Sequence, residues 1–505
     1  MKKFFDVNEL VNKCKNLKKQ DKKIVLSHGV FDLLHIGHIY HFEAAKKNGD
    51  FLIVSVTSDK FVNKGSGRPV FNEKLRAKSL SSLNVVDAVV VNDSETSVKI
   101  INLLKPDVYF KGSDYKDNKS DRTKNIYKEI NAVKNNKGKV LYSNEDTFSS
   151  SNIINKKIDF YSEKQKDYIN RISKKYSFEY IEKVINSFEN INTSVVGETI
   201  IDQYYFCNVL GKSGKEPHLV ISDEKNEKYL GGAAAVANHT SSFCKAVNFL
   251  SIVGQKETQL NFIKKKLYKN INSDFLIKKN CPTILKKRYI DKVSGTKLLG
   301  VYTSDDIQED KKRENLFLKK LKAISKKSQL IIISDYDHGF ISAKNAYQIT
   351  KLKNFVSLNA QVNASNHGYH SLTKYKKINT LLINENELRH EMRNKSEDIR
   401  KLSFKIKKRF NITNLVVTRG RKGALMILKN MKRIECPAFT EKVVDKVGAG
   451  DAMLSILSLC LYSNVPGDLA LFLGSLAGAN KVEYMGNSQY LSKKKILRNI
   501  EFLLK

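Results

Sequence analysis

The sequence has no apolar stretch that approaches the roughly 18 residues needed for a membrane-spanning helix. Its first residues, Met1 to Asp6, reach an acidic side chain before any apolar core, so we do not expect a secretory signal. The 6 cysteines are scattered, and no two of them form a CxxC pair. That pattern favours reduced thiols over a disulfide framework or a zinc site, and we expect a cytoplasmic protein with no membrane span.

Acidic residues are scarce relative to basic ones. The chain carries 52 Asp and Glu against 89 Lys and Arg, a formal net charge of +37 at pH 7. Such a field attracts nucleotides and sugar phosphates, and it can also attract nucleic acid or an anionic membrane. The basic residues are mostly lysines spread along the whole chain, which favours solvated faces, and no nucleic-acid-binding module accompanies them. We therefore do not expect nucleic acid as a partner.

The length of 505 residues is too great for one ordinary core and favours two or three domains, while 41% hydrophobic residues support normal globular packing. Up to about residue 155 the chain alternates short β-rich runs with helical stretches. We expect strands at residues 24–27, 51–56, 88–91 and 108–110, and helices at 39–47, 72–83 and 98–104. This alternation implies βαβ units and a parallel sheet, in which the loops at the carboxyl ends of the strands bind ligands.

From residue 158 to about residue 190 the pattern becomes charged, helical and free of glycine and proline, which suits a connecting helix. A second α/β pattern begins at residue 194, and its expected buried strands lie at residues 330–334, 380–383 and 415–418. The expected fold class is α/β, with two doubly wound parallel-sheet domains. We place these domains at residues 1–158 and 193–505, with a helical connector at residues 159–192.

Residues 28–38 read HGVFDLLHIGH, and they follow an expected strand. Gly29 lets the backbone approach a ligand, and the helix start beyond Gly37 offers N–H groups to phosphate. His35 and His38 are three residues apart, so a first helical turn brings both rings to one side. Nucleotidyl transfer needs no protein nucleophile, because positioning and charge neutralisation at phosphorus do most of the catalysis. The motif predicts a nucleoside triphosphate site; capping or core histidines, or a His-x-x-His metal pair, are the alternatives.

A second motif, GAGD, stands at residues 448–451 before an apolar helix expected at 454–461. Gly448, Ala449 and Gly450 let successive N–H groups converge on an oxyanion at the start of that helix. Asp451 would then take the proton from an attacking hydroxyl as a γ-phosphoryl group moves. The alternative is a plain Asp N-cap after a glycine turn. Together, the two motifs predict an enzyme that phosphorylates a small polyol or sugar and then attaches a nucleotide to the product.

The amino-terminal motif and its surroundings resemble the HxGH nucleotidyltransferase superfamily, in particular its cytidylyltransferase-like group. The resemblance spans residues 22–158 and implies a Rossmann-like domain. In that family pattern Lys64 would contact triphosphate, and Asp32 would lie near the acceptor phosphate or a metal. The implied nucleotide- and phosphate-binding residues of this half are Gly29, Phe31, Asp32, Gly37, Lys64, Arg68, Lys111, Ser150 and Ser151. Solvated loop charges at 64 and 68, and a plain N-cap at the serine pair, are the alternatives.

Residues from about 194 to the end resemble the ribokinase and PfkB-type carbohydrate kinases, which implies a ribokinase-like fold. The implied substrate-binding residues are Asp202, Gly231, Gly232 and Asn238. The implied nucleotide- and phosphate-binding residues are Asn384, Glu387, Thr418, Gly420, Gly423, Gly448, Ala449, Gly450 and Asn480. Within this set, Asn384 and Glu387 form an N-x-x-E pattern that organises Mg²⁺ and phosphate. Glu387 is the implied metal contact, and Asn480 lies where adenine contacts are expected.

Both halves are most similar to the bifunctional heptose 7-phosphate kinase and heptose 1-phosphate adenylyltransferase family, in which the order of the two domains is reversed. Two segments depart from that family. Its kinases carry a lysine before the glycine of an Asp-Tyr-x-Lys-Gly segment, whereas this chain has His338 before Gly339. Where the family carries Asp-Pro-Lys, residues 358–366 read LNAQVNASN. Two cationic contacts are missing or moved, which leaves open the identity of the sugar and the full activity of the kinase half.

The expected function is that of a bifunctional sugar-activating enzyme. The carboxyl-terminal half would transfer phosphate from ATP to a sugar or sugar phosphate. The amino-terminal half would couple a sugar phosphate to a nucleotide from ATP or CTP and release pyrophosphate, with Mg²⁺ neutralising triphosphate charge in both steps. The resemblance implies nucleotide-sugar supply for surface polysaccharide such as lipopolysaccharide, and we expect a homodimer. The alternatives are a nucleotidyltransferase whose kinase-like half only binds sugar or mediates dimerisation, and a basic nucleic-acid-binding protein.

Overall fold

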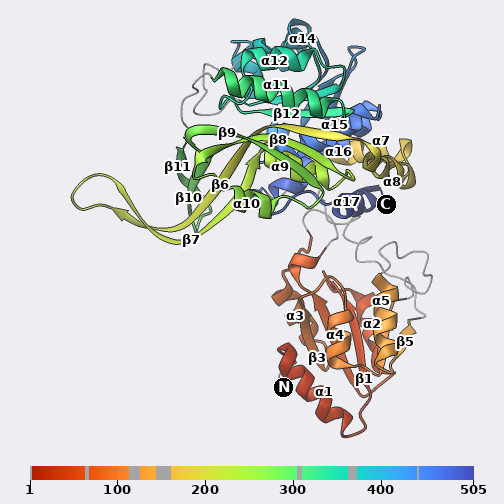
Figure 1. Cartoon of the computed structure of the whole chain (residues 1–505). Coiled ribbons are helices and arrows are strands. Elements are labelled where there is room, and N and C mark those ends of the chain that lie inside the picture. Colours follow the sequence, from red (N-terminus) through yellow and green to blue (C-terminus); the bar gives the residue numbers. More distant parts are fainter. Residues whose placement is uncertain are drawn as a thin grey trace. The chain divides into compact units, whose positions relative to one another are not determined.

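The chain folds into two compact units, Met1–Phe160 and Tyr161–Lys505. The computed structural model of the protein describes residues 3–62, 68–112, 125–143, 161–303, 310–361, 372–440 and 443–504. Each unit has its own sheet and its own covering helices (Figure 1). The prediction of an α/β protein with two parallel-sheet domains is therefore confirmed.

The first unit is a five-stranded parallel sheet with the strand order β3-β2-β1-β4-β5. Its strands are β1 (Ile24–Gly29), β2 (Phe51–Thr57), β3 (Ala88–Asn92), β4 (Val108–Lys111) and β5 (Lys139–Tyr142). Its helices are α1 (Val7–Lys18), α2 (Ile36–Lys46), α3 (Glu73–Ser81), α4 (Val98–Leu104) and α5 (Asn125–Asn135), with a 3₁₀ turn at Asp59–Phe61. The strand order reverses beside β1, which is the switch point where ligands bind in open α/β sheets.

Alternate residues of β1 enter different apolar clusters. Ile24 and Leu26 lie in the cluster formed with α1, α4 and α5, whereas Val25 lies with Phe42 of α2 and Leu80 of α3. All of these side chains are fully buried. A strand covered on both faces needs apolar residues at every position, which is why this strand reads as an unbroken apolar run in the sequence.

The second unit is built on a parallel sheet with the order β9-β8-β6-β12-β13-β14-β15, and two antiparallel strands extend one edge. The parallel strands are β6 (Thr193–Lys212), β8 (Val247–Lys256), β9 (Ile271–Pro282), β12 (Leu330–Asp335), β13 (Phe355–Ala360), β14 (Ile378–Asn384) and β15 (Ile412–Thr418). The edge strands are β16 (Ala424–Ile427) and β17 (Arg433–Cys436). The strands expected near residues 330, 380 and 415 are present.

Strand β6 has 20 residues, and it leaves the main sheet to enter a smaller one. Its first part pairs with β8 and β12. From Thr199 onward it pairs with β7 (Leu219–Gly232), and from Ile201 onward with β10 (Leu285–Asp291), on which β11 (Lys297–Thr303) follows. The hairpin of β6 and β7 projects from the body of the unit (Figure 1). The small sheet thus begins where β12 ends, at the edge where ligands of parallel sheets bind.

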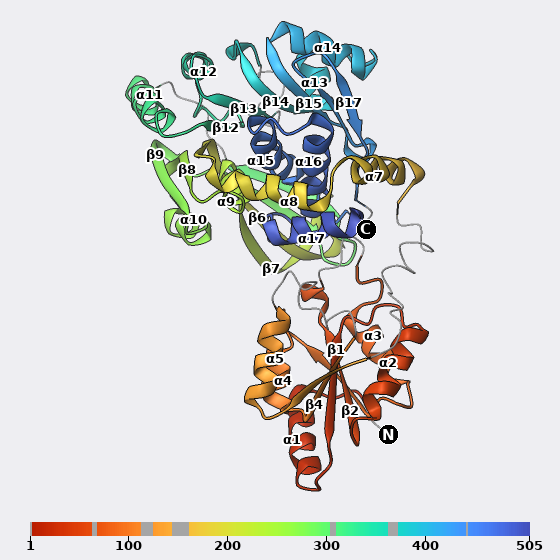
Figure 2. The same ribbon diagram turned by 90° about the vertical axis from the view of Figure 1, so that its right-hand side faces the viewer.

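Helices cover both faces of the main sheet (Figure 2). One layer contains α9 (Ala233–Ser241), α15 (Ala449–Tyr462) and α16 (Gly467–Val482). The other contains α11 (Lys311–Ser325), α12 (Ala343–Thr350), α13 (Glu385–Glu391) and α14 (Ile399–Arg409), and α10 (Leu260–Lys266) lies between β8 and β9 in the chain. Among the described residues, every helix is too short or too polar to cross a bilayer.

Helices α7 (Glu163–Lys175), α8 (Phe178–Ser187) and α17 (Lys493–Leu504) pack on the first layer. Tyr168 donates from its hydroxyl to the backbone oxygen of Asp468 at 3.0 Å, and Lys175 pairs with the same aspartate at 2.6 Å. The helical stretch between the two sheets is therefore anchored to the second unit by packing and by polar contacts with α16.

Candidate active sites

The first candidate site lies at the carboxyl end of β1, where Gly29 ends the strand at the switch point of the first unit. His35 is the N-cap of α2, and its Nδ1 accepts from the backbone N–H of Gly37 at 3.1 Å. His38 lies in the first turn and accepts at Nδ1 from the backbone N–H of His35 at 3.4 Å. These caps let α2 begin at Ile36, three residues before the helix start expected at 39.

The rings of His35 and His38 stack with their centroids 3.9 Å apart and their planes at 29°. A neutral imidazole whose Nδ1 accepts a hydrogen bond carries its proton at Nε2. Both histidines therefore hold an Nε2–H donor, the form that suits hydrogen bonds to phosphate oxygens. Capping and phosphate binding are compatible in this geometry, because the cap uses Nδ1 and a phosphate would use Nε2.

The loop after β1 has an unusual backbone. Phe31 and Leu33 both have positive φ, 49° and 55°, in the left-handed region that side chains rarely adopt. Such strain costs about 1–3 kcal/mol per residue and persists only where the surroundings impose it. Asp32 lies between the two and is buried, and its carboxylate accepts from the backbone N–H groups of Val70 at 2.8 Å and Phe71 at 3.1 Å. The carboxylate thus ties the strained loop to the chain before α3.

Arg68 and Asp32 contact each other. Arg68 Nη1 lies 3.3 Å from Asp32 Oδ2, and the two side chains are 2% and 1% exposed. Removing one partner of such a buried pair leaves a buried charge uncompensated, so the pair acts as a clamp on the loop. The phosphate contacts implied for Arg68, and the acceptor or metal contact implied for Asp32, stay predictions.

Arg76 of α3, whose position also matches the nucleotidyltransferase pattern, makes a second clamp that we did not predict from the sequence. Its guanidinium donates to the backbone oxygens of Phe71 at 2.9 Å, Val30 at 2.6 Å and Thr57 at 2.8 Å. It also pairs with Asp59 at 2.6 Å, and the Arg76 side chain is fully buried. One guanidinium therefore fixes the loops that follow β1 and β2, which frame the candidate site.

Lys111 ends β4 beside β1 and pairs with Glu129 of α5 at 3.3 Å, with both side chains 8% exposed. Burial raises the pKa of the Glu129 carboxyl, but the charge of Lys111, the charge that His28 gains in acid and hydrogen bonds from Ser97 outweigh burial and bring the pKa to about 2. Burial and the charge of Lys111 lower the pKa of His28 to about 4, so that ring is neutral at pH 7. An ion pair thus lies next to the histidine motif, and phosphate binding by Lys111 stays a prediction. Lys64, Ser150 and Ser151 lie outside the described residues.

The second candidate site lies at the amino end of α15. Gly448 is the N-cap with φ 85°, and a Cβ there would come within 2.6 Å of Asn487 Oδ1, so only glycine fits without strain. Ala449, Gly450 and Asp451 form the first turn, and part of the surface of Asp451 is exposed. The first N–H groups of a helix have no partners within it, and they form a natural cradle for a phosphoryl oxyanion.

Asp451 is held by a tyrosine from a distant segment of the chain. The hydroxyl of Tyr336, on the loop after β12, donates to Asp451 Oδ1 at 2.9 Å. That loop is itself organised by Glu198 of β6, whose buried carboxylate accepts from the backbone N–H groups of Tyr336 at 3.0 Å and His338 at 3.2 Å. The sequence analysis assigned no role to Tyr336 or Glu198. The available signal was an acidic residue inside the apolar run at 195–201.

The environment of Asp451 raises its proton affinity. Burial, reinforced by the charge of Asp202, raises the pKa of Asp451 to about 6, although Tyr336, Lys481 and Lys286 all lower it. A carboxylate with a pKa in this range is ionised at neutral pH and still accepts a proton readily, as a general base requires. The pKa and the position at an anion cradle agree with the predicted base role of Asp451.

Asp202 lies on β6 just beyond the main sheet and is buried. Arg288 of β10 donates to its Oδ1, and Lys286 lies opposite Asp202 in the register of the two strands. Gly231 is required here, because a Cβ at that position would lie 2.2 Å from Asp202 Oδ2. Gly232 has φ 58° and caps α9. The small sheet thus presents one carboxylate near Asp451, the arrangement expected for binding sugar hydroxyls.

Residues predicted to bind the nucleotide lie at the ends of β14 and β15. Asn384 lies opposite Thr418 in the strand register, and Gly420 and Gly423 shape the following turn with φ of 56° and 85°. Asn384 and Glu387 cap α13 reciprocally, with both bonds at 2.9 Å. The described residues contain no group of three or more His, Cys, Asp or Glu side chains that could hold a metal. Mg²⁺ held mainly by nucleotide phosphates needs only one or two protein carboxylates, and the metal contact of Glu387 stays a prediction.

Two asparagines of the predicted site are engaged within the protein. Asn238 of α9 donates to the backbone oxygen of Lys266 at 3.1 Å and accepts from the backbone N–H of Tyr268 at 3.0 Å. Asn480 of α16 donates to the oxygen of Leu476 one turn earlier at 3.3 Å. Their contacts with substrate and adenine stay predictions.

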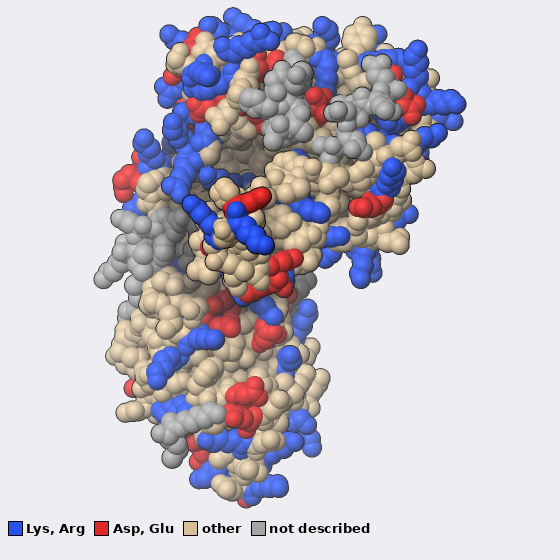
Figure 3. All heavy atoms as spheres, turned by 90° about the vertical axis from the view of Figure 1, so that its left-hand side faces the viewer, with Lys and Arg blue, Asp and Glu red and all other residues tan. Residues whose placement is uncertain are grey.

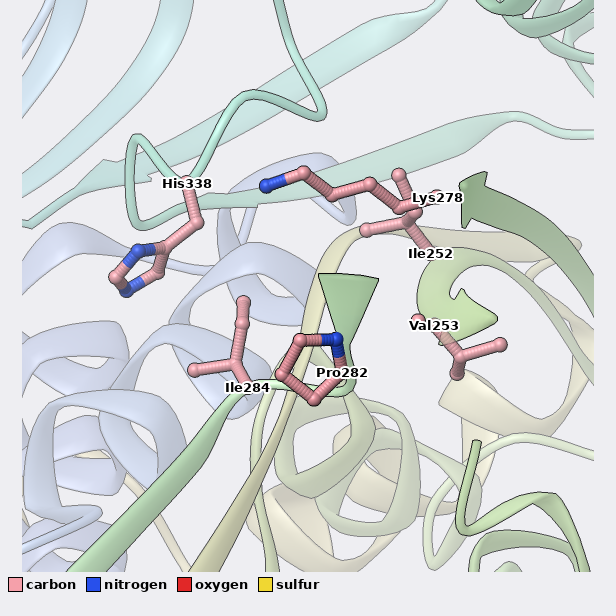
Figure 4. Close-up of a pocket in the computed structure, with 7 residues that line it drawn as sticks. Ile252, Val253, Lys278, Pro282, Ile284 and His338 are labelled. Atoms are coloured by element: carbon pink, nitrogen blue, oxygen red, sulfur yellow. The ribbon is translucent and has the colours of Figure 1, made fainter. Parts of the chain in front are cut away.

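The loop after β12, where the sequence departs from the heptose kinases, is contacted by a lysine from a later segment of the chain. Lys374 Nζ lies 2.7 Å from Asp335 Oδ2 and 3.0 Å from Asp337 Oδ1, at the end of β12. His338, on the same loop, lines a pocket with Lys278 at the ends of β8 and β9 (Figure 4). Burial and the charges of Lys286 and Lys278 lower the pKa of His338 to about 4, so its ring is neutral. Among the described residues, its Nε2 has no hydrogen-bond partner.

On the face drawn in Figure 3, Lys and Arg side chains are scattered among uncharged residues rather than gathered in one stripe. This distribution agrees with lysines on solvated faces. It lacks, on that face, the continuous basic track by which many proteins follow a nucleic acid backbone.

Two family models match the chain. The pfkB family carbohydrate kinase model covers residues 191–494, and the cytidylyltransferase-like model covers residues 26–156. The first match spans more than half of the sequence. The chain therefore belongs to the pfkB family of carbohydrate kinases, with a cytidylyltransferase-like region before it, in the order that the sequence analysis expected.

Curated relatives match the amino-terminal part of the chain. The "Bifunctional protein HldE" of Campylobacter jejuni subsp. doylei is 50% identical over 103 residues, 20% of this chain and 22% of the relative. The "Bifunctional protein HldE" of Helicobacter pylori (strain P12) is 42% identical over 137 residues, 27% of this chain and 28% of the relative. The matched segments thus span only about a quarter of the length of these relatives.

A solved structure of phosphofructokinase-2 from Escherichia coli matches the chain with a TM-score of 0.50 and 15% identity, covering 62% of this chain and 100% of that one. At this identity the match shows the fold alone. It confirms the ribokinase-like architecture of the second unit.

Proposed function

We propose that the chain is a bifunctional sugar-activating transferase. The observation that carries the proposal is that the residues predicted to handle phosphate lie at two separate helix starts. His35 and His38 stand at the start of α2, and Asp451 stands in the first turn of α15. Membership of the pfkB family, the cytidylyltransferase-like match and the similarity to HldE proteins support the two activities.

In the kinase step, a hydroxyl of a sugar or sugar phosphate attacks the γ-phosphorus of ATP. The hydroxyl proton passes to the Asp451 carboxylate, the new bond joins the sugar oxygen to the γ-phosphorus, and the bond to the β-phosphate oxygen breaks to release ADP. The N–H groups of the 448–450 turn receive charge on the transferred group. Mg²⁺ bound with the nucleotide would neutralise phosphate charge, with Glu387 as its protein contact.

In the nucleotidyl step, a phosphate oxygen of the sugar phosphate attacks the α-phosphorus of ATP or CTP. The bond between the α-phosphorus and the β-phosphate breaks, and pyrophosphate leaves. The Nε2–H groups of His35 and His38 donate to phosphate oxygens as negative charge shifts. The product is a nucleotide-activated sugar, which suits the supply of surface polysaccharide synthesis.

The test is incubation of the full chain with Mg²⁺, ATP or CTP and a panel of sugars and sugar phosphates, with products identified by mass. The proposal expects a phosphorylated sugar and a nucleotide-linked sugar. A nucleotide-linked product without any sugar phosphorylation would instead assign only binding or dimerisation to the second unit. If neither product forms with any sugar or sugar phosphate of the panel, both proposed activities are rejected.

A homodimer and a cytoplasmic location are part of the same proposal. The cytoplasm supplies ATP and keeps thiols reduced, which suits the scattered cysteines of the sequence. Sedimentation equilibrium of the purified chain tests the dimer, and a mass equal to one chain at micromolar concentration would reject it. Cell fractionation tests the location.

A further inference from the structure

Lys481 is a buried lysine beside the second candidate site. It lies near the end of α16 and is 2% exposed, and its ammonium donates to the backbone oxygen of Gly486. A Cβ placed on Gly448 would come within 3.0 Å of Lys481 Cε. The lysine side chain therefore runs directly against the turn that begins the anion cradle.

Three carboxylates act on this ammonium through their charge. The charges of Asp445, Asp451 and Asp202 all raise the pKa of Lys481, although burial has the larger effect and lowers the pKa to about 8. Asp445 Oδ2 also accepts from the backbone N–H of Gly486 at 3.0 Å, so the same short loop contacts both the acid and the lysine. Burial of an ammonium is costly unless opposite charge or function compensates it.

Negative charge accumulates at the second site, and the Lys481 ammonium offsets part of it. Asp445 pairs with Lys297 at 2.6 Å and Asp202 pairs with Arg288, but a triphosphate adds further negative charge beside Asp451, and like charges at short range repel strongly where water is excluded. A fixed positive charge against the turn offsets that repulsion without any rearrangement during the reaction. Lys286 and Arg288 lie on the small sheet beside Asp202, whereas Lys481 lies against the cradle itself.

We propose that Lys481 is a positioning residue of the kinase site, whose charge keeps the 448–451 turn ready for the triphosphate and holds Asp451 ionised. The inference rests on the proposed kinase activity. It assigns to Lys481 a role through the turn and Asp451, with no direct contact to the sugar.

The test compares Lys481→Met and Lys481→Arg with a matched control, Lys407→Met, in the full chain. Lys407 is likewise buried, at 5% exposed, and donates to the backbone oxygens of Ile412 and Thr413, and burial alone lowers its pKa. We expect Lys481→Met to lower kcat for phosphoryl transfer about 100-fold. We expect Lys407→Met to change kcat less than about threefold and Lys481→Arg to recover part of the loss.

Two readouts separate a charge effect from a structural one. Asp451 faces Tyr336, Asp202, Lys286 and Lys481, so removal of the Lys481 charge should move the acidic limb of the kcat–pH profile to higher pH. Added ammonium chloride should restore at least about tenfold of the lost rate by placing a cation in the vacated space. If the acidic limb of the profile does not move and ammonium does not restore the rate, Lys481 only connects α16 to the loop at residue 486. That result would overturn the proposal.

The outcome stays interpretable if the wild-type chain phosphorylates no sugar, which would reject the proposed kinase function instead. Calorimetry with Mg²⁺ and a non-hydrolysable ATP analogue then measures how Lys481 affects nucleotide binding in the absence of turnover. The proposal expects Lys481→Met to weaken analogue binding about tenfold relative to Lys407→Met, and equal affinities would contradict it.

Discussion

The hydroxyl of Tyr336 donates to Asp451 Oδ1 over 2.9 Å, which joins the loop after β12 to the first turn of α15. This bond links two segments more than a hundred residues apart in the chain. It orients the carboxylate that we assign as the base, while Glu198 fixes the backbone of the tyrosine from behind. The catalytic geometry of the second site therefore depends on buried polar contacts as well as on the GAGD motif itself.

Tyr336→Phe removes this hydrogen bond with little change in volume. Because the bond lowers the pKa of Asp451, its loss should raise that pKa above about 6 and move the acidic limb of the kinase pH profile upward. We expect kcat to fall about tenfold, the usual scale for one lost hydrogen bond to a charged group. Tyr168→Phe, which removes a hydroxyl bonded to Asp468 on α16, is the matched control and should leave the pH limb in place.

The pH dependence of the wild-type kinase should follow Asp451. A base with a pKa of about 6 is protonated and inactive below that pH, so kcat/KM should rise through pH 6 and level off above pH 7. Rates that stay constant from pH 5 to pH 8 would argue against Asp451 as the base.

The same shift has a consequence for stability. The folded-state pKa of Asp451 lies above its unfolded value, so its favourable contribution is present at low pH and is lost as pH rises through about 6. Asp451→Asn should therefore abolish phosphoryl transfer and yet raise Tm by a few degrees at pH 7.5, with a smaller gain at pH 5. Thermal unfolding at the two pH values checks this, and a lower Tm for the variant at pH 7.5 would show that the carboxylate stabilises the fold.

His35→Asn separates capping from catalysis at the first site. Asparagine is a favoured N-cap and can accept the bond that Nδ1 now accepts, but it lacks the Nε2–H donor. We expect nucleotidyl transfer to fall about 100-fold or more while stability changes by less than about 1 kcal/mol. Pyrophosphate release and denaturant unfolding measure the two effects; a variant that keeps its rate would leave His35 as a cap alone.

Glu129→Gln tests the ion pair next to the histidine motif. The lowered folded-state pKa of Glu129 means that its stabilisation is present above pH 4.5 and is lost as pH falls toward about 2. The variant should be less stable than the wild type at pH 7, by about 3–5 kcal/mol because Lys111 is left buried without its partner. The difference should shrink as pH falls through that window. Urea unfolding at pH 7 and pH 3 checks both statements, and a constant difference would contradict the shift.

The parts of this protein that the sequence predicts are local. The motifs at 28–38 and 448–451 each predict a turn and the helix that follows, although α2 begins at Ile36 and α15 at Ala449, before the starts expected at 39 and 454. Unbroken apolar runs, such as residues 24–26 and 330–333, predict strands buried on both faces.

The unpredicted parts depend on contacts between distant segments. Arg68 pairs with Asp32. Lys374 pairs with Asp335 and Asp337 at the end of β12. Lys481 lies against Gly448 because α16 returns past α15. A lysine among 89 basic residues carries no sequence signal that marks it as buried, so only the fold identifies it.

The central claim is that one chain carries two independent transferase sites. Its most direct test measures sugar phosphorylation and nucleotidyl transfer, each with its own supplied substrate, in the wild type, Asp451→Asn and His38→Ala. We predict that Asp451→Asn loses only phosphorylation and that His38→Ala loses only nucleotidyl transfer. Full phosphorylation by Asp451→Asn, or full nucleotidyl transfer by His38→Ala, would contradict it.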